Sequence, residues 1–139
     1  MKIPYGISNF GDLRRGGFFY VDKTPFLPRL ESAEAGYRHL LFLRPRRIGK
    51  SLLLSLLEHY YDIGRAEQFD ELFRGLWIHE NPTPERNRYL VLSLDFSPVA
   101  TDGGVDALRR SFADTVRNCL RPFCMRHGAR IPQLAALYD

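Results

Sequence analysis

The sequence predicts an α/β fold from two apolar runs of strand length and the helical patterns that follow them. Residues 39–43 read His-Leu-Leu-Phe-Leu, and residues 50–62 then place leucines at helical spacing. A second apolar run covers 89–96 and precedes an amphipathic pattern over 105–126. Strands that alternate with helices in this way are typical of a sheet covered by helices on both faces. We therefore expect a three-layer sandwich.

The remaining elements follow from local signals. Thr24 and Pro25 predict a helix start, because threonine caps the first amides and proline needs no donor there; this helix is expected to end near Glu34. Pro122 should kink or break the long helix that contains it. Three further segments are expected: a short helix over 66–73, an extended or loop segment over 75–78, and a short final helix over 131–138.

The turn after the first apolar run carries the chemistry. It reads Arg-Pro-Arg-Arg-Ile-Gly-Lys-Ser over 44–51, so that Gly49, Lys50 and Ser51 open the following helix. This order of strand, loop and helix is that of a phosphate-binding P-loop. The loop amides point at one anion, and the helix N-terminus adds about half a positive charge. Lys50 would reach the β- and γ-phosphates of a nucleotide, and the Ser51 hydroxyl would coordinate Mg²⁺.

The motif has one departure from the full pattern. A glycine is expected five residues before Gly49, and this chain has Arg44 there. An alternative interpretation makes Gly49 a turn glycine, Lys50 a solvated side chain and Ser51 a helix cap. The apolar patterns on either side of the turn favour phosphate binding.

Four motifs occur in order along the chain, at 3–10, 20–26, 43–51 and 90–97. They read Ile-Pro-Tyr-Gly-Ile-Ser-Asn-Phe, Tyr-Val-Asp-Lys-Thr-Pro-Phe, Leu-Arg-Pro-Arg-Arg-Ile-Gly-Lys-Ser and Leu-Val-Leu-Ser-Leu-Asp-Phe-Ser. With them the chain resembles the N-terminal part of the bacterial AAA-ATPase-like family. The family's loop reads Arg-Pro-Arg-Arg-Phe/Ile-Gly-Lys-Ser/Thr, so Arg44 belongs to its pattern. Members commonly carry a PD-(D/E)xK nuclease domain after the ATPase domain.

The resemblance implies an incomplete P-loop NTPase-type three-layer sandwich, the front half of an AAA-like domain, with 1–139 as one truncated domain. It implies ATP and Mg²⁺ as cofactors of a variant Walker A loop. Strands 39–43 and 89–96 would take their neighbours from beyond residue 139, so self-association or a partner covering the open sheet is expected. Nucleic acid would be a partner through a linked nuclease. The expected cofactor-binding residues are Arg46, Arg47, Ile48, Gly49, Lys50, Ser51 and Leu52, with Ser51 also binding magnesium.

Asp95 closes the second apolar run, as a Walker B aspartate would, and is a second candidate magnesium ligand. Phe96 follows it, where AAA-type enzymes place the glutamate that polarises the attacking water. The alternative is a buried strand whose last aspartate meets the turn before Ser97 and Pro98. Catalytic residues stay unassigned, and we expect nucleotide binding without hydrolysis by this chain alone.

The first two motifs suggest a place for the nucleotide base. In P-loop ATPases of this branch, residues before the central strand often fold over the base. The resemblance therefore makes an adenine pocket from Tyr5, Ile7, Tyr20, Val21 and Lys23. Alternatively, these side chains only seal the sheet edge, and Asp22 with Thr24 only caps a helix.

Composition leaves a second class of function open. The chain has 139 residues, of which 45% are hydrophobic and 26% charged, as in a globular domain with one modest core. No apolar run approaches the roughly 20 residues of a membrane span, and no secretory signal is visible, so we expect no membrane partner and a cytoplasmic location. The net charge of +4 also fits a basic module, or an inactive remnant, that binds nucleic acid or protein without nucleotide.

Overall fold

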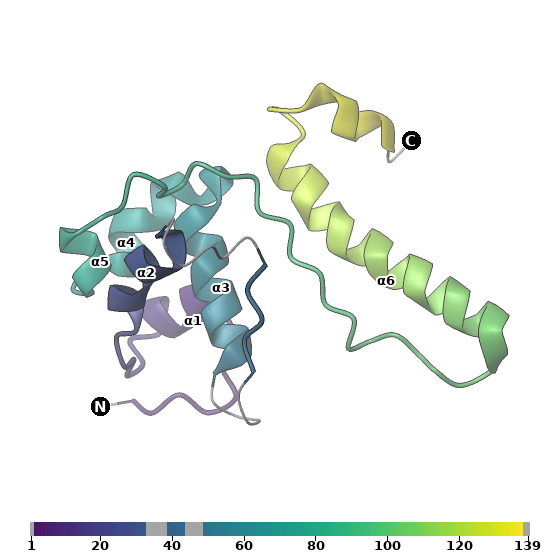
Figure 1. Cartoon of the computed structure of the whole chain (residues 1–139), viewed down its shortest axis with the longest axis horizontal. Helices are drawn as coiled ribbons and strands as arrows, with labels where there is room; N and C mark the ends of the chain where they lie inside the picture. The colour runs from purple at the N-terminus through teal and green to yellow at the C-terminus, as the bar shows by residue number, and fades with distance from the viewer. Residues whose placement is uncertain (1, 33–38, 44–48, 138–139) are drawn as a thin grey trace. The chain divides into compact units, whose positions relative to one another are not determined.

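The computed structural model describes residues 2–32, 39–43 and 49–137, and the chain divides into two compact units at residues 89 and 90 (Figure 1). The first unit contains the helices α1 (Phe10–Arg15), η1 (Thr24–Phe26), α2 (Leu27–Glu31), α3 (Lys50–Tyr61), η3 (Ile63–Gln68), α4 (Phe69–Phe73) and α5 (Trp77–Glu80). The second unit contains α6 (Gly104–His127) and the 3-10 helix η4 (Pro132–Leu137).

The expected sheet does not form within the described residues, which are predominantly helical. Their β-structure consists of two isolated bridges, Lys2 with Phe18 and Asp62 with Tyr89. The prediction of an α/β fold, an incomplete P-loop NTPase-type three-layer sandwich, is therefore wrong. The two apolar runs at 39–43 and 90–96 have no regular secondary structure.

The physical reason is that a strand depends on a neighbour. Its amides and carbonyls are satisfied by ladder hydrogen bonds to a second extended segment, and neither apolar run has such a ladder within the described residues. The first run was expected to be covered on both faces, yet Leu41 is 79% exposed and Leu43 is 76% exposed. Apolar composition signals a tendency to be buried, but it does not supply the partner.

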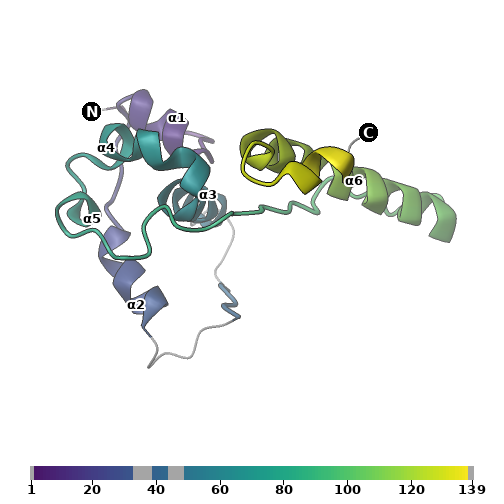
Figure 2. The same cartoon turned by 90° about the horizontal axis from the view of Figure 1, so that it is seen from above.

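Aromatic side chains make the core of the first unit. Phe73 is fully buried and lies 5.0 Å from Phe10, 5.6 Å from Tyr60 and 5.1 Å from Phe69, measured between ring centroids. α4, which supplies Phe73, contacts both α1 and α5 (Figure 2). The complete buried cluster is Phe10, Leu27, Leu56, Tyr60, Phe69, Leu72, Phe73, Leu76 and Ile78.

The helix expected after the Gly-Lys-Ser turn is confirmed. α3 begins at Lys50, as predicted, and ends at Tyr61, one residue before the predicted end. One face of α3 enters the core through Leu56 and Tyr60, which are 1% and 0% exposed. Leu54, on the other side of the helix, is 66% exposed. One face of α3 therefore packs in the core of the first unit, while the N-terminal end of α3 lies at the surface.

The second unit is a long helix with a chain segment along it. The Ala100 amide donates to Ser111 Oγ at 2.8 Å, and the Phe96 ring stacks on Phe112 at 5.5 Å. α6 continues through Pro122, so the expected break is not found there. None of the helices in the described residues has both the length and the apolar composition needed to cross a membrane.

Candidate functional site

A hollow of about 590 Å³ lies at the N-terminal end of α3. Two segments that are distant in sequence line it: Pro4–Ser8 and Gly49–Leu52. Four of the seven residues predicted to bind the cofactor thus share one cavity wall. The other three, Arg46, Arg47 and Ile48, lie outside the described residues.

Gly49 adopts a backbone conformation that glycine favours. Its φ is +83°, in the left-handed region, where a Cβ would add strain even though its nearest neighbour would be 3.9 Å away. Its carbonyl accepts a hydrogen bond of 2.9 Å from the Leu53 amide, which starts the helical ladder. The amides of the first turn precede that ladder, and Gly49 has no side chain with which to cap them. They lie where the helix dipole favours an anion.

Lys50 and Ser51 are both exposed and follow Gly49 on the same wall of the hollow. The residues therefore bring an ammonium group, a hydroxyl group and a helix N-terminus to one cavity. This combination can hold a phosphate group through charge and hydrogen bonds.

The other wall of the hollow comes from the first motif of the chain. Tyr5 is 99% exposed, and Ile7 is partly buried beside it. Sequence reasoning named both as base-pocket residues but did not name Pro4, Gly6 or Ser8, which line the same wall. The motif at 3–10 was the available signal, because it groups all five within one short segment.

Three other candidates for the base pocket do not line this hollow. Tyr20 is partly buried, and its ring meets Phe10 edge-on at 5.6 Å. Burial raises the pKa of the Tyr20 phenol to about 12. Val21 and Lys23 are exposed. The Tyr20 side chain thus packs at the edge of the core.

Asp22 and Thr24 accept hydrogen bonds from amides at the starts of two helices, in line with the alternative interpretation. The prediction that Thr24 is the N-cap is wrong, because Thr24 is the first residue of η1. Asp22 Oδ1 accepts hydrogen bonds from the Thr24 amide at 2.8 Å and from the Thr24 hydroxyl at 2.6 Å. Thr24 is fully buried, and its Oγ1 accepts from the Ile78 amide at 3.2 Å. The pair therefore joins η1 to the start of α5.

Asp95 belongs to the second unit. Its Oδ1 accepts a hydrogen bond of 2.9 Å from the Ser97 amide, and this bond lowers the pKa of the Asp95 carboxyl. The turn expected by the alternative interpretation is thus present, although the strand before it is not. The role of Asp95 as a magnesium ligand stays a prediction. Across the described ranges, no three His, Cys, Asp or Glu residues are grouped to hold a metal ion.

Comparisons with known proteins identify the family. Residues 4–134 match the AAA-ATPase-like family, described as "Predicted AAA-ATPase". A relative named "Uncharacterized protein in vnfD 5'region", from Azotobacter chroococcum mcd 1, is 41% identical over 99 residues. The matched region covers 68% of this chain and 17% of that protein, so the chain spans only a small part of its relative's length. No solved structure matches the chain. Because the family match covers nearly all of the sequence, the chain belongs to the AAA-ATPase-like family.

Proposed function

We propose that this chain binds a nucleoside triphosphate, ATP, together with Mg²⁺, at the hollow between Pro4–Ser8 and Gly49–Leu52. One observation carries the proposal. The residues of the Gly-Lys-Ser turn line a cavity at the N-terminus of a twelve-residue helix, and the left-handed glycine precedes that helix. The volume of about 590 Å³ lies within the range of small-molecule sites in proteins.

The residues present fit the chemistry of this ligand. Lys50 supplies a positive charge for the β- and γ-phosphates, and the amides of the first α3 turn supply hydrogen-bond donors. The Ser51 hydroxyl is an oxygen ligand of the kind that Mg²⁺ uses beside phosphate oxygens. Bound Mg²⁺ would neutralise part of the phosphate charge. Arg46, Arg47 and Ile48 belong to the proposed loop by sequence.

The proposal concerns binding. In the second unit, the Asp95 carboxylate has a partner in the Ser97 amide, and Phe96 occupies the next position. No residue is assigned here to the activation of water.

A fluorescent ATP analogue titrated into the chain tests the proposal, with and without Mg²⁺. We expect magnesium-dependent binding, weakened by about 10-fold or more in Lys50→Ala, because a charged hydrogen bond is worth roughly 1.5–3 kcal/mol. Lys23→Ala is the matched control, since Lys23 is an exposed lysine that does not line the hollow. It should bind as the unaltered chain does.

Salt-sensitive DNA binding without nucleotide binding would support the alternative function. If the chain binds no nucleotide but binds DNA with an affinity that falls steeply with salt, the nucleotide proposal is wrong. The basic-module hypothesis, based on the net charge of +4, then takes its place.

A further inference from the structure

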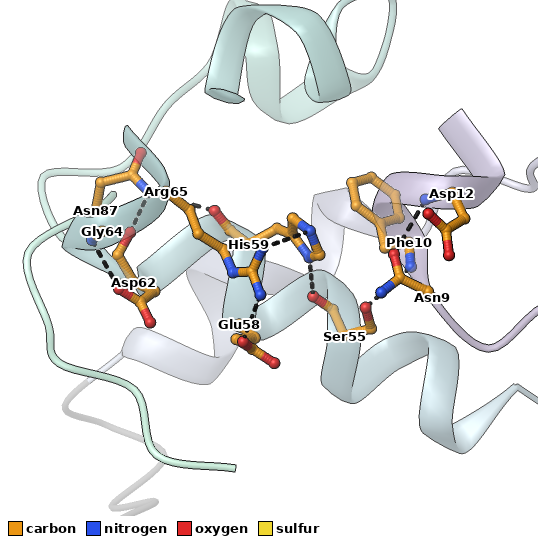
Figure 3. A network of polar contacts seen from close by, with 10 residues as sticks. All are labelled: Asn9, Phe10, Asp12, Ser55, Glu58, His59, Asp62, Gly64, Arg65 and Asn87. Atoms are coloured by element: carbon orange, nitrogen blue, oxygen red, sulfur yellow. Dashed lines mark hydrogen bonds and ion pairs between the residues drawn. The ribbon is translucent and has the colours of Figure 1, made fainter. Parts of the chain in front are cut away.

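The two walls of the hollow are joined by a contact just behind it. The Phe10 amide donates a hydrogen bond of 2.9 Å to Ser55 Oγ, across 45 residues of sequence (Figure 3). Ser55 lies one helical turn after Ser51, on the same helix that forms one wall. Phe10 follows the other wall, Pro4–Ser8, by two residues. This hydrogen bond therefore links the segments that carry the two walls and helps to fix their relative position.

The bond also completes the start of α1. Asn9 Oδ1 accepts from the Asp12 amide at 3.0 Å, so Asn9 caps α1 from within the same segment. Phe10 is the first residue of α1, and its amide has no acceptor inside that helix. Ser55 supplies the acceptor from α3. The chain direction at Asn9, the residue after the wall Pro4–Ser8, is thus fixed by one contact to its own helix and one to α3.

Gly11 allows the close approach of the two helices. A Cβ on Gly11 would lie 3.0 Å from His59 Nε2, 3.0 Å from Arg15 Nη1 and 3.2 Å from Asn9 Oδ1, all tighter than ordinary van der Waals contact. Of these groups, His59 belongs to α3. The His59 ring has little room to move, because its Nδ1 lies 2.7 Å from the Ser55 carbonyl and its Nε2 lies 3.2 Å from Arg65 Nη1 (Figure 3). His59 is 2% exposed, and Phe10 packs edge-on against it at 5.9 Å. We call the Phe10–Ser55 bond and the Gly11–His59 contact the α1–α3 clamp.

We propose that the α1–α3 clamp sets the spacing between the two walls of the hollow, and that Ser55 is a positioning residue for the nucleoside part of the ligand. The inference rests on the proposed function. The triphosphate would contact Gly49–Leu52, which keep their geometry as long as α3 is intact. The base and ribose would contact Pro4–Ser8, whose position depends on the clamp. Loss of the clamp should therefore affect the two parts of the ligand unequally.

Calorimetric titrations with ATP and with inorganic tripolyphosphate separate the two parts. In Ser55→Ala we expect ATP to bind about 5-fold more weakly, as for the loss of one neutral hydrogen bond, while tripolyphosphate affinity stays within about 2-fold. Ser55→Thr keeps the hydroxyl group and should restore ATP binding. If Ser55 had a purely structural role, Ser55→Ala would lower the affinities for ATP and for tripolyphosphate by similar factors.

A second variant reaches the same clamp without touching Ser55. Gly11→Ala inserts a methyl group between α1 and His59. It should also lower the affinity for ATP more than the affinity for tripolyphosphate. Hydrogen exchange of the Phe10 amide in the unaltered chain gives a readout that needs no variant. We expect ATP, but not tripolyphosphate, to slow this exchange, because only a ligand that touches both walls holds them together.

The inference is overturned if Ser55→Ala lowers the affinities for ATP and tripolyphosphate equally, or if both clamp variants bind ATP as the unaltered chain does. It is also overturned if the two ligands slow the exchange of the Phe10 amide equally. Failure of the proposed function gives a different pattern. In that case the unaltered chain binds neither ATP nor tripolyphosphate.

Discussion

The backbone amide of Trp77 donates a hydrogen bond of 2.7 Å to Oδ2 of Asp22, a residue 55 positions earlier in the chain. The other carboxylate oxygen of Asp22 holds Thr24, so one side chain fixes the starts of two helical segments. The first unit is therefore held together by the polar contacts of Asp22 as well as by its aromatic core.

Replacement of Asp22 tests the importance of this contact. Asp22→Ala should lower the free energy of unfolding by about 1–2 kcal/mol, because it removes a cap and leaves the Trp77 amide without its acceptor. Trp77 is the single tryptophan of the chain, so its fluorescence during urea unfolding reports on the first unit directly. Asp102→Ala removes an exposed aspartate from the second unit and should leave the Trp77 transition unchanged. Equal effects of the two variants would contradict the capping role.

Gly49→Ala separates backbone strain from ligand binding. Alanine at φ +83° should cost about 1 kcal/mol or more of stability. Gly75→Ala is the matched control: its φ is +79°, and a Cβ there would meet no atom within 4 Å, but Gly75 does not line the hollow. We expect similar losses in thermal stability for both variants and weaker ATP binding for Gly49→Ala alone. Equal nucleotide affinity of the two would remove Gly49 from the site.

The two faces of α3 should respond differently to truncation. Leu56→Ala should destabilise the first unit by about 2–5 kcal/mol, because Leu56 is 1% exposed and its loss leaves a cavity. Leu54→Ala, two residues earlier and 66% exposed, should change stability by less than about 0.5 kcal/mol. Chemical unfolding followed by Trp77 fluorescence measures both. A large loss in Leu54→Ala would mean that this face is covered.

The stability of the first unit should fall in mild acid. Burial lowers the pKa of His59 below its usual 6.5, and the charges of Arg65 and Arg15 act in the same direction. The hydrogen bond to the Ser55 carbonyl and the charge of Glu58 oppose this shift without reversing it. Below pH 6.5 the unfolded state therefore binds a proton more readily than the folded state does. The free energy of unfolding decreases as pH falls from 6.5 toward the lower folded-state pKa, and this contribution is fully present above pH 6.5.

His59→Asn isolates that effect. The asparagine amide can still donate to the Ser55 carbonyl, but it does not titrate. Unfolding measured between pH 5 and 8 should show a shallower pH dependence in the variant than in the unaltered chain. The same slope in both would show that other groups cause the acid sensitivity.

Sequence reasoning succeeded where a pattern is local. α3 was predicted almost to its ends, because the Gly-Lys-Ser turn and the leucine spacing both belong to one segment. It failed where structure depends on distant contacts. The segment 75–78 was expected to be extended or loop, yet α5 begins at Trp77, whose amide meets Asp22 far away in sequence. The apolar runs predicted strands, but no sequence pattern states whether a neighbouring strand is present.

For the candidate site, the lining segment Gly49–Leu52 was predictable and the lining segment Pro4–Ser8 only partly so. Phosphate binding there stays a prediction. Gly49, Lys50 and Ser51 form a short local motif at the start of α3, so that sequence alone could bring them together. Tyr5 and Ile7 were grouped with Tyr20, which the structure places against the core. The sequence shows that an aromatic motif exists but not which of its rings turns inward.

The buried cluster of the first unit includes both Phe10 and Ile78. During synthesis on the ribosome, a nascent chain that has not yet reached Ile78 lacks one edge of that cluster and the amide that closes onto Thr24. Its N-terminal segment has emerged long before and must wait for the later helices. We therefore expect the first unit to become protease-resistant in a single step once Ile78 has left the ribosome, rather than helix by helix.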